Sequence, residues 1–114
     1  MPDLERSQVV WVNFNPTKGS EQAGHRPALV ISTDEFNSII PNVVVVLPVT
    51  TRDRGLPHHV RLQGPDLSLD QESYAMTEQP RTIDRQRITG TAGNVDLNTM
   101  KSIDLWLRDF LGLR

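Results

Sequence analysis

The segment VVVVLPVTTR, at residues 43–52, decides how the rest of the chain folds. Its first five residues, 43–47, are all apolar and mostly β-branched, which is typical of a central strand covered on both faces. Pro48 and the polar residues after it are expected to end this strand, because proline has no N–H to donate. The sequence therefore predicts a sheet with residues 43–47 in its interior.

Shorter strands are predicted on both sides of this central segment. They show either apolar and polar residues in alternation or a short apolar run, and they lie at residues 9–14, 28–31, 58–63, 73–77 and 81–89. Alternation within residues 58–63 places His59 on a solvent-exposed face. A turn is predicted around Gly90 and Gly93, since glycine pairs of this kind often interrupt strands.

Two helices complete the predicted set of elements. Ser32 and Glu35 have the spacing of a capping box, which indicates a short helix that Pro41 ends. Asp96 is the expected N-cap of a C-terminal helix that stops at Gly112. The apolar stripe of this helix comprises Leu97, Met100, Ile103, Leu107, Phe110 and Leu111. The chain, residues 1–114, is expected to form one α+β domain: a curled, barrel-like sheet of five to seven short strands with helices outside.

Composition excludes several classes of protein. The apolar and charged fractions, 37% and 23%, are those of a globular domain rather than a disordered chain. The longest apolar run, residues 43–49, is far shorter than the roughly twenty residues of a membrane helix, so no membrane association is expected. The polar start MPDLERS lacks a signal-peptide core, which favours the cytoplasm. Without cysteine, disulfides, zinc–thiolate sites and cysteine nucleophiles are excluded.

The charge pattern leaves two interpretations open. A net charge of −2 argues against bulk attraction to nucleic acid. Ten of the twelve basic residues are nevertheless arginine, whose planar guanidinium can hold a phosphate with two N–H groups. They contribute to two islands: Arg52, Arg54, His58, His59 and Arg61, then Arg81, Arg85 and Arg87. Simple solubility would explain an arginine-rich surface equally well.

The polar loop at residues 15–27, NPTKGSEQAGHRP, contains the strongest candidates for chemistry. Pro27 favours an extended backbone at Arg26, which places this arginine at the mouth of the following strand. If that strand neighbours the central one, Arg26 and Thr50 can lie close together, and Glu21 can fold back toward them. A carboxylate, a guanidinium and a hydroxyl can cleave an RNA phosphodiester without metal, with arginine stabilising charge. Each residue type, taken alone at such a position, is more often an ordinary surface or turn residue than a catalytic one.

The histidines are weaker candidates. His25 lies beside Arg26 and is a possible proton-transfer group, because histidine titrates near neutrality. His58 and His59 are neighbours in a predicted strand, so their side chains are expected on opposite faces, where they could not bind one metal ion. No metal site is therefore predicted, although either residue could act as a general acid.

Three segments carry a resemblance to a known family. VVWVNFNPTKGSEQAGHRPALVIS at residues 9–32, LPVTTR at 47–52 and EQPRTID at 78–84 are similar, in this order, to the MazF/PemK (Kid) family of bacterial toxin endoribonucleases. The resemblance implies a curled, SH3-like β-barrel that forms a homodimer and holds single-stranded RNA in grooves. It implies cleavage of mRNA at a short site without metal or other cofactor, leaving a 2′,3′-cyclic phosphate and a 5′-hydroxyl. The implied partner is a MazE-like antitoxin.

The same resemblance implies roles for individual residues. Arg26 and Thr50 would be the catalytic pair, and Glu21 a base or a substrate contact. The implied RNA contacts are Gln22, Thr51, Arg52, Arg54, His58, Glu78, Gln79 and Arg81. Met76 stands where the Kid branch has a catalytic arginine, so the Kid division of roles cannot operate unchanged.

Two other functions remain open at the level of sequence. A CcdB-like poison would bind DNA gyrase without RNA chemistry, but such toxins typically end in Trp-Gly-Ile, and this chain ends in Phe-Leu-Gly-Leu-Arg. An inactive, antitoxin-binding scaffold is the third possibility.

Overall fold

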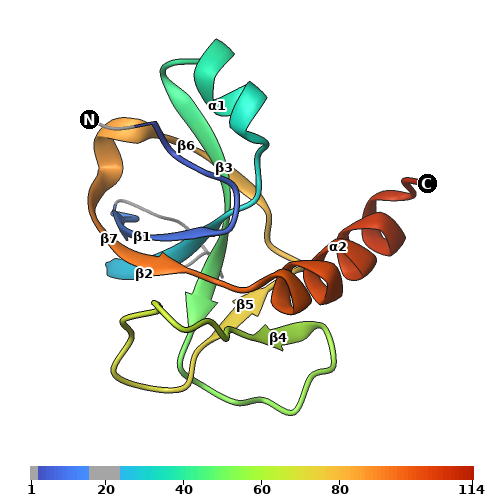
Figure 1. Ribbon diagram of the computed structural model, residues 1–114. Helices are drawn as coiled ribbons and strands as arrows, with labels where there is room; N and C mark the ends of the chain where they lie inside the picture. Colours follow the sequence, from blue (N-terminus) through green and yellow to red (C-terminus); the bar gives the residue numbers. More distant parts are fainter. Residues whose placement is uncertain (1–2, 16–23) are drawn as a thin grey trace.

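The computed structural model describes residues 3–15 and 24–114 (Figure 1). In these residues seven strands form one curled antiparallel sheet in the order β4-β5-β3-β2-β1-β7, with β6 also paired to β3. The elements are β1 (Gln8–Asn13), β2 (His25–Val30), α1 (Asp34–Ile39), β3 (Val43–Thr50), β4 (His59–Arg61), β5 (Tyr74–Met76), β6 (Arg81–Asp84), a 3₁₀ turn (Arg85–Arg87), β7 (Ile88–Asn94) and α2 (Leu97–Leu111). The predicted α+β fold is confirmed, with a sheet that curls without closing.

Both faces of the sheet are buried against apolar side chains. On the outer face, Leu29 and Leu47 pack with Ile103 and Leu107 of α2. On the inner face of the curl, a second core comprises Leu4, Val10, Val12, Phe14, Ala28, Val30, Val44, Val46, Ile83 and Ile88. Successive residues of β3 alternate between these two cores, because side chains of a strand alternate between faces. The prediction that residues 43–47 are covered on both sides is confirmed.

Strand β3 continues to Thr50, so the prediction that Pro48 ends it is wrong. One edge of β3 pairs with β6 as far as Val46 and with β5 from Val49 onward. Pro48 falls between these two ladders, opposite Ala28 on the other edge. A proline at this position interrupts neither ladder, which is why the strand tolerates it.

Strand β7 runs through Gly90 and Gly93, where a turn was expected. The pairing of β1 with β7 shifts between Gln8 and Val10, which marks a bulge in β7. Gly93 has φ 86, a left-handed conformation that glycine adopts without strain. The bulge bends β7 and lets the chain follow the curl of the sheet.

The two helices are capped close to the predicted positions. The N-cap of α1 is Thr33 rather than Ser32, and its hydroxyl accepts a hydrogen bond from the N–H of Phe36 at 3.1 Å. Ser32 instead connects the segment before α1 to β3, because its hydroxyl accepts a hydrogen bond from the N–H of Val45 at 3.1 Å. Asp96 caps α2 as predicted, and Gly112 ends it with φ 67.

Only the middle of the α2 apolar stripe is buried. Met100, Ile103 and Leu107 are buried, whereas Leu97 and Leu111 are 80% and 56% exposed. The last turn of α2 projects beyond the sheet (Figure 1), which leaves Leu111 largely exposed there. Among the described residues, no helix is long and apolar enough to cross a membrane.

Replacing Gly93 with alanine is expected to destabilise the fold far more than the same change at Gly55. Both glycines have positive φ, so both substitutions carry backbone strain of about 1–2 kcal/mol. A Cβ at Gly93 would also overlap the backbone carbonyl of Asp66, whereas a Cβ at Gly55 meets nothing within 4 Å. Overpacking adds about 1–3 kcal/mol or more. Urea unfolding of both variants measures the difference, and equal losses would contradict the close approach.

Candidate active site

Arg26 and Thr50 lie at the same end of two neighbouring strands. Strands β2 and β3 are antiparallel, with Ala28 paired to Pro48. Continuing this register by two residues places Arg26 opposite Thr50. Residues opposite one another in an antiparallel pair project to the same face, and so do residues two apart in one strand. Arg26 and Thr50 therefore extend the face of Ala28, on the inner side of the curl. The expected adjacency of the two strands is confirmed.

The two residues differ in exposure. Thr50 is only 7% exposed, and its hydroxyl oxygen accepts a hydrogen bond from the N–H of Arg52 at 3.1 Å. This bond orients the hydroxyl, which still carries a hydrogen to donate. Arg26 is exposed at the start of β2, while its backbone is held by the sheet. The pair combines a fixed hydroxyl with an exposed arginine.

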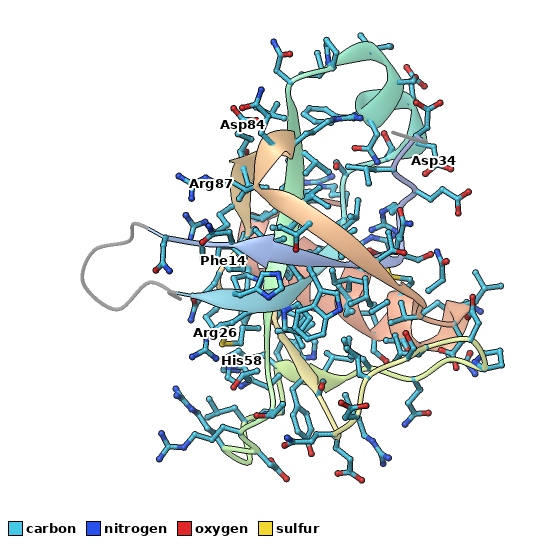
Figure 2. The ribbon with its side chains drawn as sticks, turned by 90° about the vertical axis from the view of Figure 1, so that its left-hand side faces the viewer. Phe14, Arg26, Asp34, His58, Asp84 and Arg87 are labelled. Carbon is cyan, nitrogen blue, oxygen red and sulfur yellow. The ribbon has the colours of Figure 1, made fainter. Side chains whose placement is uncertain are left out.

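The same face continues over β6. Arg81 pairs with Val46 of β3, and its guanidinium carbon lies 4.9 Å from the ring centroid of Phe14. A cation over an aromatic face is favourable and holds the guanidinium in place. In Figure 2, Phe14 and Arg26 lie on the same side of the molecule. Phe14 was missed by the sequence reasoning, although its alternation with Val12 placed it on this face.

The second arginine island divides between this face and purely structural positions. Arg87 donates to the backbone carbonyls of Asn13 and Asn15 at 3.1 and 2.6 Å. Arg85 donates to the carbonyls of Val43 and Asn37. These two guanidinium groups hold chain segments together, so of this island only Arg81 faces the candidate site.

His58, His59 and Glu78 form a compact cluster beside this face. The Nε2 atom of His59 lies 3.1 Å from the Glu78 carboxylate, and that of His58 lies 3.5 Å from it. The prediction that the two histidines point to opposite faces is wrong, because β4 begins only at His59. His58 belongs to the preceding turn, where the alternation of a strand does not apply. The prediction that His59 is exposed to solvent is also wrong, since His59 is only 7% exposed.

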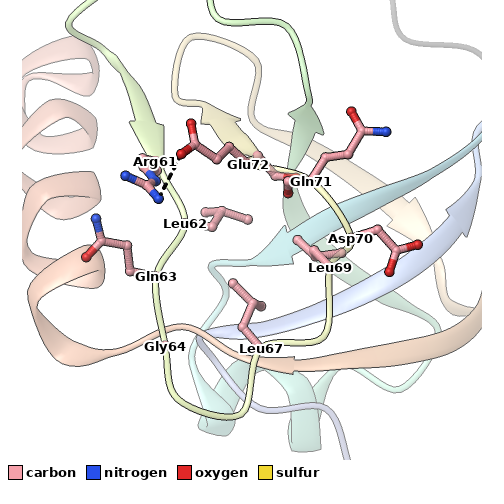
Figure 3. Close-up of a pocket in the computed structure, with 10 residues that line it drawn as sticks. Arg61, Leu62, Gln63, Gly64, Leu67, Leu69, Asp70, Gln71 and Glu72 are labelled. Atoms are coloured by element: carbon pink, nitrogen blue, oxygen red, sulfur yellow. Dashed lines mark hydrogen bonds and ion pairs between the residues drawn. The ribbon is translucent and has the colours of Figure 1, made fainter.

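A separate polar pocket of about 300 Å³ lies beside β4, below the 64–73 connection (Figure 3). Arg61, from the first island, forms an ion pair of 3.0 Å with Glu72 at its rim. Both side chains are more than half exposed, and exposed pairs contribute little to stability. The Arg61 side chain therefore pairs with Glu72 at the rim of this pocket.

The comparisons with known proteins agree with this architecture. A family model described as the PemK-like, MazF-like toxin of type II toxin–antitoxin systems matches residues 5–111. The chain belongs to this family. It is 33% identical to the endoribonuclease EndoA of Bacillus subtilis over 111 residues, which cover 96% of each protein. It is 39% identical to the endoribonuclease toxin MazF of Escherichia coli K12 over 83 residues, which cover 73% of this chain and 68% of that protein.

Solved structures show the same fold. The crystal structure of MazF from Deinococcus radiodurans has a TM-score of 0.85 at 28% identity, covering 99% of this chain and 100% of that one. A chain of the MazE–MazF complex from the same organism has a TM-score of 0.80 at 27% identity, covering all of both chains. The curled sheet and the C-terminal helix of this PemK/MazF-like chain are thus those of its family.

The remaining candidate residues are distributed unevenly. Glu21 and Gln22 lie outside the described residues. Thr51, Arg52 and Arg54 are exposed on the β3–β4 connection, next to Thr50.

His25 is on the face of β2 opposite to Arg26. Its ring stacks on Trp11 with centroids 5.4 Å apart, and its Nε2 lies 2.6 Å from the Thr89 hydroxyl. The structure therefore does not bring His25 together with Arg26 and Thr50.

The free energy of unfolding is expected to depend on the protonation of Glu78. Partial burial raises the pKa of this carboxyl, but hydrogen bonds from its own backbone N–H, the His59 ring and the Gln79 amide outweigh burial and lower it below 4.5. A lowered folded-state pKa stabilises the protein above the unfolded-state pKa, and this contribution is lost as the pH falls through the folded value. Between about pH 6 and about pH 3, the wild type should therefore lose more stability than Glu78→Gln.

Urea unfolding at several pH values measures this difference. Glu72→Gln is the matched control, because its carboxylate is 62% exposed and pairs only at the surface. Parallel pH profiles for the wild type and Glu78→Gln would contradict the prediction.

Proposed function

We propose that this chain is a toxin endoribonuclease that cleaves single-stranded mRNA at a short recognition sequence, without metal or other cofactor. The pairing of β2 with β3, whose register continued by two residues sets Arg26 opposite Thr50 at one end of a rigid sheet, supports the proposal. Membership of the PemK/MazF toxin family and the likeness to EndoA and MazF, both named endoribonucleases, support it. These likenesses favour ribonuclease activity over gyrase binding.

In this reaction the 2′-oxygen of the ribose attacks the adjacent phosphorus and the bond to the 5′-oxygen breaks. The 2′-hydroxyl loses a proton to a base, and the departing 5′-oxygen gains one from a water molecule. The products are a 2′,3′-cyclic phosphate and a 5′-hydroxyl. Arg26 donates N–H groups to the phosphorane oxygens, since a pKa above ~12 makes a guanidinium a poor proton donor. Thr50 donates its hydroxyl to the same charged centre, and Glu21 is either the base that takes the proton from the 2′-hydroxyl or a substrate contact.

RNA binds at the end of the inner face where Arg26 and Arg81 lie, and along the neighbouring connections. Arg81 is held over Phe14, and Arg52 and Arg54 are exposed beside Thr50. Guanidinium groups at these positions suit phosphate contacts. Thr51, His58, Glu78, Gln79 and Gln22 are the other RNA contacts of this proposal.

The protein acts in the cytoplasm as a homodimer, and a MazE-like antitoxin inhibits it. The similar fold of the MazE–MazF complex supports an antitoxin partner. Exposed apolar side chains on the outer half of α2 and just after it support further partner contacts: Leu105, Phe110 and Leu111 of the helix and Leu113 beyond its C-cap are 65%, 45%, 56% and 60% exposed. Apolar side chains gathered on one surface are typical of interaction sites.

A single assay tests the proposal. The purified protein is incubated with a long defined RNA in excess EDTA, and the new 5′ ends are mapped. Cleavage at one short sequence, with 5′-hydroxyl ends, is the expected result. A strict requirement for a divalent cation would contradict metal-free chemistry. Intact RNA together with co-purification of gyrase would favour the CcdB-like alternative, and intact RNA with antitoxin binding alone would favour the inactive scaffold.

A further inference from the structure

We propose that His58, His59 and Glu78 bind one zinc ion through two imidazole nitrogens and one carboxylate. The proposal concerns metal binding and does not depend on RNA cleavage at Arg26 and Thr50, although it uses His58 and Glu78, which the proposed function also places in contact with RNA. It rests on the three side chains that the turn before β4, β4 itself and the segment after β5 bring together.

The separations between the donor atoms fit a tetrahedral zinc site. Zinc binds imidazole nitrogen and carboxylate oxygen at about 2.0–2.2 Å, so two ligands of a tetrahedral ion lie about 3.4 Å apart. The two Nε2···Oε1 separations, to Glu78 from His59 and His58, are 3.1 and 3.5 Å. All three donor atoms lie within 4.8 Å of one another. Two of the three separations thus already match a tetrahedral ion, and rotation of the side chains would adjust the third, which is at most 4.8 Å.

The backbone around the cluster is already ordered. The Thr77 hydroxyl donates to the carbonyl of His58 at 2.6 Å, and the N–H of His59 donates to the carbonyl of Leu56 at 3.1 Å. His59 also pairs with Met76 of β5. These contacts fix the two connections that carry the ligands, so little chain entropy is lost when the ion binds.

The ion has a path from solvent and an open position. The side chain of His59 is 2% exposed, whereas those of His58 and Glu78 are 23% and 36% exposed. One ligand is thus buried and two lie at the surface. Three protein ligands leave the fourth tetrahedral position to a water molecule or to an anionic oxygen, the arrangement of open zinc sites.

The donor set favours zinc over hard cations. Imidazole suits zinc, copper and nickel, whereas magnesium and calcium prefer oxygen ligands alone. The chain has no cysteine and one further histidine, His25, so few other side chains compete for a zinc ion. The same contacts could also serve as a hydrogen-bonded clamp without metal, and the test below separates the two.

Zinc chloride titrated into the untagged, chelator-treated full chain tests the site. One equivalent should bind, and thermal unfolding should shift upward by at least about 5 °C at a hundredfold excess over Kd. Loss of one ligand in His58→Gln or Glu78→Gln should weaken binding at least about 10–100-fold, the loss that even outer-shell partners produce. His25→Gln is the matched control and should bind zinc as the wild type does. A competing dye reports the affinities.

Several outcomes would overturn the site. Binding of less than one equivalent, or equal affinity in the wild type, His58→Gln and Glu78→Gln, would leave only the hydrogen-bonded clamp. Loss of binding in His25→Gln would place the ion elsewhere. His59→Gln removes a buried ring and can unfold the protein, so the two more exposed ligands provide the decisive variants, with circular dichroism confirming their fold.

Discussion

Arg26→Ala should leave the fold intact and lower the rate of RNA cleavage by about 10²–10³-fold, the typical cost of removing one group that stabilises a transition-state charge. The side chain is exposed at the start of β2, so truncation leaves no cavity in the core. The backbone pairing of Val12 with Arg26 needs no side chain. The loss should therefore appear in catalysis and not in stability.

Two further variants sharpen this test. Arg26→Lys keeps the charge but loses the planar fork, so its rate should lie between those of the wild type and Arg26→Ala. Arg108→Ala removes an exposed arginine of α2 and should cleave as the wild type does. Single-turnover rates at saturating protein, with unfolding curves for each variant, provide the measurement. Wild-type cleavage by Arg26→Ala would remove the proposed mechanism, or reveal a contaminating nuclease.

The strands could be predicted from sequence because their apolar residues alternate or cluster over short lengths. Residues 43–47 needed cover on both faces, and the structure supplies it through two cores. The predicted strand end at Pro48 and the predicted turn at Gly93 were wrong, in each case for a local reason. Pro48 and Gly93 would each interrupt an isolated strand. In this sheet, Pro48 lies where β3 stops pairing with β6 and starts pairing with β5, so no hydrogen bond from its nitrogen is needed. Gly93 lies at the bulge of β7, which needs its left-handed backbone conformation.

Within the candidate site, sequence could place backbone positions but not side-chain partners. The position of Arg26 opposite Thr50 follows from continuing the register of two paired strands. The cluster around Glu78 does not, because it depends on the residue at which β4 begins. A strand that started one residue earlier would separate His58 from His59. The structural roles of Arg85 and Arg87 were equally hidden, since their acceptors are backbone carbonyls of segments distant in sequence.

Thr50→Val should lower the rate of the chemical step by about 10²-fold or more, because it deletes the hydroxyl while keeping nearly the same volume. Thr50 is buried, so an isosteric change avoids a cavity. The N–H of Arg52 loses its acceptor, which costs about 1 kcal/mol of stability or somewhat more. A loss of this size leaves a folded protein.

The control variants separate catalysis from packing at Thr50. Thr50→Ser restores the hydroxyl and should recover the rate to within about tenfold of the wild type. This difference is small compared with the loss of about 10²-fold expected when the donor is removed. Thr82→Val makes the same chemical change at an exposed position of β6 and should have no effect. RNA binding, followed by fluorescence anisotropy, should change little in Thr50→Val, because the hydroxyl acts on charge that develops only in the transition state. Equal rates for Thr50→Val and Thr50→Ser would show that this threonine only shapes the end of β3, and Arg26 would then stabilise the phosphorane without it.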